Sequence, residues 1–413
     1  MITLTEPTIN FLPSFNRINF DISSDNATAT GFKFAVKIYN ADTGTLVTTA
    51  YYDPAPLPFS AITFDVSRFL IEGYQWQNLF PETGEWKFNE CILNRFYLKC
   101  YEYYDVLGNG IYEIDPATEV ISNTYTCFAG SFNFFDRPEW DDNRYNGEAD
   151  SYYPLTDEVN FQLHQDFFKV FTFYDPNDYI TSIGISRIDN TGSTNYSSIK
   201  PLNAGGDSLT HFTFIPVDWG ATDQTIQFNL SINYTNPLGV QSEQFATITL
   251  FDCKKYEVKN IVWINRFGGL DSYSFILANR KSTQVEKKQY QRDYTDYGQT
   301  FIDPYNIFQN TSPTYYTKEI QKITINTEYL TDRESIIFRQ LYSSPLIYLY
   351  AKGDYLFNNA EFPEQSFIGN THSAFIPVKL NANAYEIKQK QNEKLYQIEA
   401  ELEYSEPSYR QIT

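Results

Sequence analysis

The residue types that most often carry catalysis or bind metals are thinly spread in this sequence. Its three histidines, His164, His211 and His372, lie far apart along the chain. None stands at the HExxH spacing of zinc hydrolases, so any histidine site would have to be assembled by the fold. The glycine-rich phosphate loop and the serine-hydrolase elbow are also absent. We therefore expect no catalytic residue, no cofactor and a protein that is not an enzyme.

Carboxylates raise a second chemical hypothesis, because calcium prefers oxygen ligands. Six of them fall within fifteen residues: Asp136, Glu139, Asp141, Asp142, Glu148 and Asp150. The EF-hand spacing fails, since the third position counted from Asp142 is Arg144. Most acidic clusters are solvated surfaces. We interpret residues 136–154 as an acidic linker or ordered loop, and we predict no metal site.

One basic cluster interrupts an otherwise acidic chain. It places five cations within thirteen residues: Arg280, Lys281, Lys287, Lys288 and Arg292. One interpretation is an exposed strand or loop edge that carries solvated lysines. The other is a contact for an acidic patch on a neighbouring subunit, which a chain this acidic would itself supply. This cluster is our candidate protein interface.

The overall charge limits the class of partner. The chain has 51 acidic and 31 basic residues, a formal net charge of −20. Such a chain is repelled by phosphate backbones, from which most nucleic-acid affinity derives. Sequence-specific nucleic-acid binding is therefore not expected.

The elements that must position these residues are predicted to be strands. The composition includes 34 tyrosines, 34 phenylalanines and 5 tryptophans, a bias that suits pleated sheets. Apolar and polar residues alternate over 225–234 and over 32–38, and the turn residues 40–44 follow the second run. Further turn signals recur at 107–110, 189–192, 236–239 and 352–354. Short antiparallel strands are the expected architecture.

Three other segments carry signals for particular elements. Thr331 and Glu334 form a capping box that predicts a helix near 331–342, and a shorter helix is expected near 66–71. Helix propensity favours a helix over 386–403, but the same stretch alternates with period two. We give the alternation more weight than the helix propensity and predict a hairpin there, with its turn near 391–393.

The length of 413 residues, at roughly 150 per domain, indicates several modules. We expect a mainly β, multidomain chain with two immunoglobulin- or fibronectin-like antiparallel β-sandwiches and a mixed β-rich module with one short capped helix. The expected bounds are 1–135 for the first sandwich, 136–154 for the acidic linker, 155–254 for the second sandwich and 255–413 for the β-rich module.

The sequence also gives signals about the cellular compartment in which the protein is made. The start of the sequence shows no secretory signal, and no run of about 18 apolar residues suggests a membrane span. The four cysteines, Cys91, Cys100, Cys127 and Cys253, form no CxxC pair. We expect free, mostly buried thiols in a protein made in a reducing cytosol.

Three segments together carry a resemblance to a known group of proteins: Ile62–Leu70 (ITFDVSRFL), Ile261–Phe275 (IVWINRFGGLDSYSF) and Tyr329–Leu349 (YLTDRESIIFRQLYSSPLIYL). They resemble segments of virion proteins of tailed bacteriophages that infect Bacteroidota, including the crAss-like phages. The second is similar to a recurrent hairpin of those proteins, in which an apolar strand, an Asn, an aromatic-Gly turn and an Asp precede an aromatic strand. The third is similar to the helix and strand that follow it.

This resemblance implies a structural component of the tail, neck or baseplate, made in the host cytoplasm and located in the virion. It implies a symmetric homo-oligomer, such as a ring, that contacts other virion proteins, and it carries over no catalytic residue.

The alternative is a glycan-binding fibre or adhesin. Aromatic residues could line a sugar-stacking groove, but aromatic residues that alternate in strands more often form a core. A glycosidase would need only two carboxylates, which the sequence neither forbids nor supports. A glycan ligand is thus an alternative that no motif supports. Exposed aromatics such as Tyr103 and Tyr104, expected in a hairpin loop, favour a protein interface.

Overall fold

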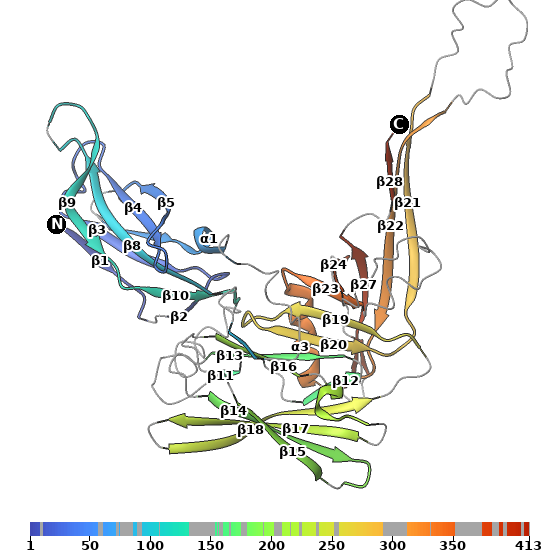
Figure 1. Ribbon diagram of the computed structural model, residues 1–413. Coiled ribbons are helices and arrows are strands. Elements are labelled where there is room, and N and C mark those ends of the chain that lie inside the picture. Colours follow the sequence, from blue (N-terminus) through green and yellow to red (C-terminus); the bar gives the residue numbers. More distant parts are fainter. Residues whose placement is uncertain are drawn as a thin grey trace, which may run out of the picture. The chain divides into compact units, whose positions relative to one another are not determined.

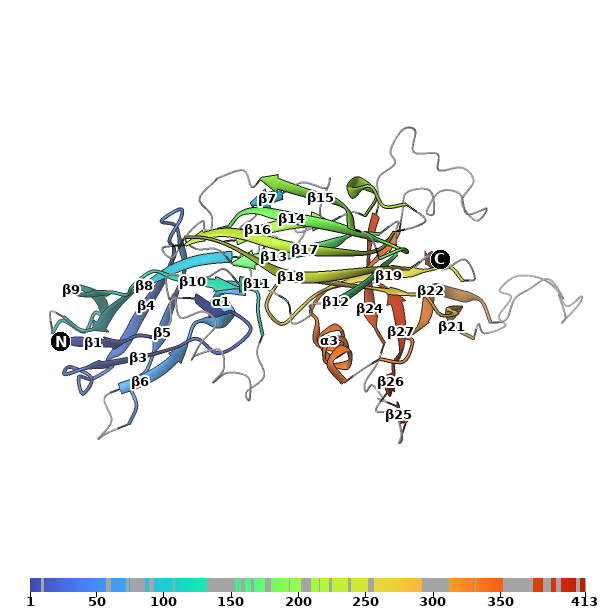
Figure 2. The same cartoon turned by 90° about the horizontal axis from the view of Figure 1, so that it is seen from below.

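The protein is mainly β, as Figures 1 and 2 show for the computed structural model. The structure describes residues 1–8, 11–56, 61–71, 74, 86–88, 93–106, 108–131, 153–154, 156, 160–164, 167–174, 180–192, 194–201, 209–214, 216–222, 225–236, 239–251, 256–291, 312–330, 332–351, 374–381, 388–390, 395–405 and 409–412. The chain forms two compact units. Unit 1 comprises Met1–Leu250 with Ile264–Asp271, and unit 2 comprises Phe251–Trp263 with Ser272–Thr413.

The N-terminal part of unit 1 contains two sheets. The first has the order β1 (Ile2–Thr5), β3 (Asn19–Ser24) and β6 (Ala61–Asp65). The second has the order β2 (Phe11–Pro13), β10 (Tyr125–Phe128), β8 (Leu93–Tyr104), β4 (Lys33–Asn40) and β5 (Leu46–Tyr52), and β9 (Glu113–Ile121) also pairs with β8. All their pairings are antiparallel except that of β2 with β10.

Alternating side chains of the two sheets form one core. Phe20 on β3 contacts Phe96 on β8 and Tyr125 on β10, with ring centroids 6.4 and 5.4 Å apart. Such aromatic pairs stabilise a core beyond the area that they bury. The expected strand at 32–38 and its turn are confirmed, because β4 pairs with β5 and Asn40 Oδ1 accepts the amides of Asp42 and Thr43.

The second pair of sheets also lies in unit 1. One has the order β11 (Tyr153–Pro154), β13 (Lys169–Tyr174), β16 (Leu209–Phe214) and β7 (Trp86–Phe88). The other has the order β12 (Asn160–His164), β18 (Gly239–Phe251), β17 (Thr225–Asn236), β14 (Ile180–Asp189) and β15 (Thr194–Pro201). A 3-10 helix, η4, spans Pro216–Trp219. Rings of both sheets meet, for example Phe214 and Phe228 at 5.1 Å.

The alternation predicted for 225–234 is confirmed from Phe228 onward, but Ile226 is 42% exposed. The register explains the difference. Ile188 of β14 is opposite Gln227 and Asp189 is opposite Thr225, so Ile226 is skipped as the extra residue of a bulge. A bulge shifts the alternation by one residue, and Thr225 is buried in place of Ile226.

Strand β7 connects residues that the sequence places in different modules. It lies within the expected first sandwich of 1–135, yet Phe212 of β16 is opposite Trp86 of β7 in the second pair of sheets. Residues 1–250, which include nearly all of both pairs of sheets, likewise belong to one compact unit. The four expected module ranges, 1–135, 136–154, 155–254 and 255–413, therefore stay predictions.

Unit 2 contains most of an eight-stranded sheet. Its order is β20 (Leu270–Phe275), β19 (Lys259–Ile264), β23 (Ile347–Ala351), β24 (Ala374–Leu380), β27 (Glu399–Tyr404), β22 (Thr314–Asn326) and β21 (Arg280–Gln289), and β28 (Tyr409–Ile412) also pairs with β22. Helix α3 (Asp332–Ser343) places Ile337, Phe338 and Leu341 in the core with Trp263 of β19. The expected helix is therefore confirmed, although Thr331 of its capping box lies outside the described residues.

The remaining elements also match the sequence. Helix α1 (Ser67–Leu70) confirms the short helix near 66–71. The expected C-terminal hairpin is confirmed as well, since β25 (Lys388–Lys390) pairs antiparallel with β26 (Leu395–Gln397). Its expected turn at 391–393 lies outside the described residues.

Candidate functional site

The basic cluster lies on strand β21, the terminal strand of the sheet in unit 2. Its partner is β22, from Arg280 opposite Thr324 to Lys288 opposite Tyr316 (Figure 1). All ten residues of β21 are exposed. Among the described residues, β21 has no second strand beside it, so one edge of its backbone is open. An open strand edge is a template for pairing with another chain.

The strand divides the cluster. Side chains alternate between the two faces of a sheet, so Arg280 and Lys288 lie on one face, and Lys281 and Lys287 lie on the other. Each face thus has one cation toward each end, about 20 Å or more apart at about 3.3 Å per residue. The fifth residue, Arg292, lies outside the described residues. The structure therefore shows a basic edge with two charged ends in place of one compact patch.

Few carboxylates neutralise this edge. Lys281 Nζ lies 3.8 Å from Glu257 Oε2, and Lys288 Nζ lies 3.9 Å from Glu286 Oε1. Glu257 also bonds Lys259, whose pKa is lowered by burial. All of the β21 side chains are exposed, and water and salt weaken such pairs. With four cations and one carboxylate, β21 carries a net charge of +3.

Aromatic residues that sequence reasoning missed flank the Lys288 end. Tyr290 and Tyr315 are 51% and 40% exposed, and their ring centroids are 6.2 Å apart. Lys288 Nζ lies 5.2 Å from the centroid of Tyr316. Only the pairing of β21 with β22 brings these residues together, because 25 positions separate Tyr290 from Tyr315. Tyrosine is enriched at protein interfaces, so the Lys288 end of β21 is suited to contact a partner protein.

A second exposed surface lies on the outer face of the sheet that contains β5, β4, β8 and β9. Tyr103 contacts Tyr51 and Tyr112, with ring centroids 5.2 and 6.3 Å away, and the two outer rings are 49% and 40% exposed. Tyr103 and Tyr104 both belong to strand β8, so the expectation that they lie in a hairpin loop is wrong. Tyr104 instead packs against the core.

The same face carries lysines beside tyrosines. Lys37 is opposite Lys99, and their Nζ atoms lie 5.0 Å from the Tyr101 ring and 5.6 Å from the Tyr39 ring. Glu119 lies 3.4 Å from Lys99 and accepts the hydroxyl of Tyr101. The hydrogen bond from Tyr101 and then the charge of Lys99 lower the pKa of the Glu119 carboxyl. Glu119 thus offsets part of the positive charge of Lys37 and Lys99 on this face.

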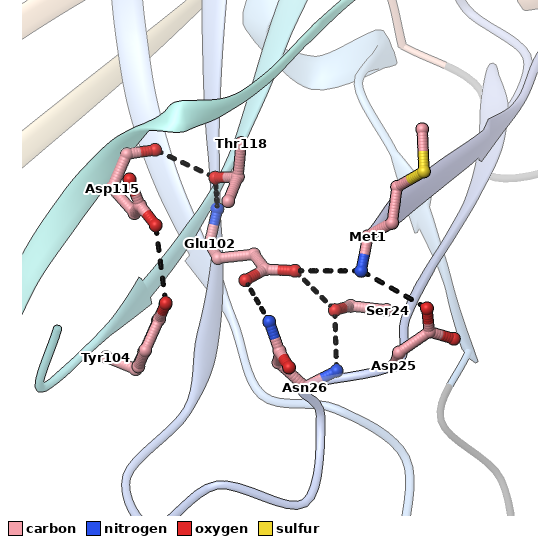
Figure 3. A network of polar contacts seen from close by, with 8 residues as sticks. All are labelled: Met1, Ser24, Asp25, Asn26, Glu102, Tyr104, Asp115 and Thr118. Atoms are coloured by element: carbon pink, nitrogen blue, oxygen red, sulfur yellow. Dashed lines mark hydrogen bonds and ion pairs between the residues drawn. The ribbon is translucent and has the colours of Figure 1, made fainter.

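Glu102 of β8 is a fully buried carboxylate within a network of polar contacts (Figure 3). Its oxygens accept hydrogen bonds from Ser24 Oγ and from Asn26 Nδ2, the latter at 2.8 Å. Asp115, opposite Glu102 on β9, accepts the Tyr104 hydroxyl at 3.3 Å. Buried polar groups need such partners to offset their desolvation. The arrangement fixes the turn after β3, and we assign it a structural role.

A second buried network explains the motif of the hairpin Ile261–Phe275. Lys169 and Asp271 are both 1% exposed, with Nζ and Oδ1 3.1 Å apart. Asn265 donates to Asp271 Oδ2 at 3.0 Å, and its Oδ1 accepts the amides of Phe267 and Gly269. The Asn and the Asp of the motif therefore hold the turn and pair a buried lysine. Burying this ion pair costs desolvation that only complete hydrogen bonding offsets.

The remaining candidate residues do not converge. In the part of the chain that the structure describes, no three His, Cys, Asp or Glu side chains could together hold a metal ion. His164 lies on β12 and His211 on β16, opposite Thr172, while His372 and the acidic segment 136–150 lie outside the described residues. None of the described helices is long and apolar enough to cross a membrane.

Two of the four cysteines are described, and both are free and buried, as expected: Cys100 and Cys127. Burial raises the pKa of the Cys100 thiol to about 12 and that of Cys127 well above its ordinary value. A thiol must ionise to act as a nucleophile. Burial therefore keeps both thiols protonated near neutral pH, which makes them weak nucleophiles in the folded chain.

No protein-family model matches the sequence, and no curated protein matches it.

Proposed function

We propose that this chain is a non-enzymatic structural subunit of the tail, neck or baseplate of a tailed bacteriophage. In this proposal it belongs to the virion and forms a symmetric homo-oligomer that also contacts other virion proteins. The observation that carries the assembly role is the open edge of β21, whose ten residues are all exposed. The virion assignment is supported by the resemblance of the segments at 62–70, 261–275 and 329–349.

The proposal includes a finer description of the fold. In the two sandwich-like parts of unit 1, two sheets contribute side chains to a shared aromatic core. We propose that both are immunoglobulin- or fibronectin-like sandwiches, a class of fold that displays its strand edges and loops for protein contacts.

Electrostatics supports contacts between subunits at β21. The strand carries a net charge of +3 within a chain of −20, so another copy approaches it with an acidic surface on average. Complementary charge steers association and fixes the relative orientation of partners. A head-to-tail contact of this kind uses two different surfaces and closes into a ring when the rotation permits.

The test is the mass of the purified chain by multi-angle light scattering, followed by imaging of any large species. We expect a closed multimer of the 48.1 kDa chain. Reversal of the five basic residues of the cluster to Glu is expected to return it to monomer. The substitutions are Arg280→Glu, Lys281→Glu, Lys287→Glu, Lys288→Glu and Arg292→Glu.

A matched control reverses five other cations and so changes the net charge by the same amount. It replaces Arg17, Lys33, Arg68, Arg339 and Lys379, which lie outside β21. The control is expected to keep the multimer at moderate salt, where long-range charge effects are screened. A wild-type chain that stays monomeric at all concentrations would contradict the homo-oligomer, and equal effects of both variants would contradict the role of β21.

A second candidate function is glycan binding by a receptor-recognition module. The row formed by Tyr51, Tyr103 and Tyr112 favours it, because exposed rings can stack on sugar rings. Binding of the isolated chain on a glycan array, with loss of the signal when Tyr51 and Tyr112 are replaced by Ala, would favour this function over assembly.

A further inference from the structure

The open edge of β21 is the surface from which a more specific partner can be derived. Within the part of the chain that the structure describes, its backbone pairs with β22 on one side only, and its side chains are exposed on both faces. Exposed lysines normally protect such an edge from unwanted pairing. The arrangement of the charges therefore determines which strands can be added and which are repelled.

Pairing of β21 with a second β21 is unfavourable. An antiparallel pair centred on Gln284 would place Arg280 opposite Lys288, and Lys281 opposite Lys287, twice each. A parallel pair in register would place every cation opposite its own copy. Like charges directly opposite each other destabilise a sheet. Direct pairing of two β21 strands, antiparallel or parallel, is therefore disfavoured by charge repulsion.

We propose that β21 binds an extended acidic segment of a partner protein, which adds to the sheet as an antiparallel strand. This inference rests on the proposed function and names the partner of the same surface. Strand addition uses backbone hydrogen bonds for affinity and alternating side chains for specificity. The acidic partner then replaces like-charge repulsion with opposite-charge pairs at both ends of β21.

The register of β21 defines the partner sequence. Read from its N-terminus, the partner places two acidic residues opposite Lys288 and Lys287, and a basic residue opposite Glu286. An apolar residue follows opposite Val285, which is 51% exposed. Three unrestricted residues come next, and two acidic residues end the strand opposite Lys281 and Arg280. The sequence expected is acid, acid, base, apolar, three variable residues, acid, acid.

The probe is a fluorescein-labelled peptide with the core Glu-Glu-Lys-Val-Thr-Ser-Thr-Glu-Glu, titrated with the full-length chain by fluorescence anisotropy. A control peptide has the same composition in shuffled order. A second control carries N-methyl groups at alternate residues, in both possible phases, which remove backbone donors and leave every charge in place. We expect the shuffled peptide and one N-methyl phase to bind about tenfold or more weakly.

The assignment of the register is tested by exchanging charges. Lys281→Glu with Lys287→Glu is expected to weaken the probe about tenfold or more, and a probe with Lys at the two matching positions should restore binding. The matched protein variant, Arg17→Glu with Arg339→Glu, changes two exposed arginines outside β21 and should bind the original probe as the wild type does. Equal binding of the probe and the shuffled peptide, no effect of either N-methyl phase, or no rescue would overturn strand addition.

Failure of this inference is separable from failure of the proposed function. If reversal of the basic cluster dissolves the multimer while the probe fails to bind, assembly through β21 stands and strand addition is wrong. If the probe binds in the expected register while the wild-type chain stays monomeric, strand addition stands and the homo-oligomer is wrong.

Discussion

Glu119 shows how single residues on the outer tyrosine face are held by their neighbours. Its carboxylate accepts the Tyr101 hydroxyl and lies 3.4 Å from Lys99. These two groups, in that order, lower the pKa of Glu119 from the ordinary value of 4.5. Since the folded chain favours the ionised carboxylate more than the unfolded chain does, the interaction stabilises the fold above the unfolded pKa. That contribution is lost as the pH falls through the lowered pKa.

Glu119→Gln is therefore expected to reduce stability near neutral pH and to matter less in acid. The measurement is the urea midpoint of wild type and variant from about pH 7 to about pH 3. The gap between the two midpoints should narrow as the pH falls below about 4.5. Glu113→Gln, an exposed change on the same strand, serves as the control. A gap that widens in acid would contradict the argument.

At the scale of elements, periodicity predicted more than propensity did. Residues 386–403 are rich in helix formers, yet Ala400 and Leu402 of β27 are buried, whereas Glu399 before them is exposed and Glu401 between them is only partly buried. A strand buries one face, and that alternation outweighs the small propensity differences. The helix α3 was predictable because its cap signal and apolar spacing agreed.

The parts of the site that sequence reasoning missed depend on which strands pair and in which register. The cations of β21 are adjacent in sequence, so their cluster was visible, but their division between two faces required the strand. The contact of Tyr290 with Tyr315 required the register of β21 with β22. Lys169 and Asp271 are separated by 102 positions, and no local pattern marks either as buried.

The turn between β19 and β20 gives a prediction at the same scale. Gly268 has a φ of +80°, and a Cβ there would meet the Ala129 carbonyl oxygen at 2.9 Å. Gly44, in the turn between β4 and β5, has a φ of +67° and open space around it. A left-handed conformation alone costs about 1 to 2 kcal/mol for a residue with a side chain.

Gly44→Ala is thus expected to lose about 1 kcal/mol of unfolding free energy, and Gly268→Ala to lose clearly more, because a backbone carbonyl must also move. Denaturant unfolding of the two variants in parallel measures the difference. If the two variants lost the same unfolding free energy, the backbone at Ala129 would move at no cost to make room for the new Cβ. That result would contradict the argument from the close approach of Gly268 to Ala129.

For the whole molecule, the feature with the largest consequence is that unit 1 is formed by two separate segments of the chain. Residues 264–271 belong to unit 1, although they follow its main segment Met1–Leu250 in sequence after a stretch of unit 2. They contribute Asp271, the carboxylate that pairs with the buried ammonium of Lys169. A fragment cut at residue 250 keeps the lysine and loses its partner.

This division predicts a reversal of sign for one substitution. In the full chain, Lys169→Met leaves Asp271 buried without its cation, and breaking a buried pair in this way costs about 3 kcal/mol or more. In a fragment of residues 1–250, the same substitution replaces an ammonium that has lost its carboxylate partner with an apolar side chain, and it should raise the unfolding midpoint. The two effects are measured by urea unfolding of the four proteins, with Thr172→Val as a neighbouring control on β13. If Lys169→Met destabilised the fragment as well, the ammonium would have an adequate partner without residues 264–271, and unit 1 would not depend on that turn for its charge balance.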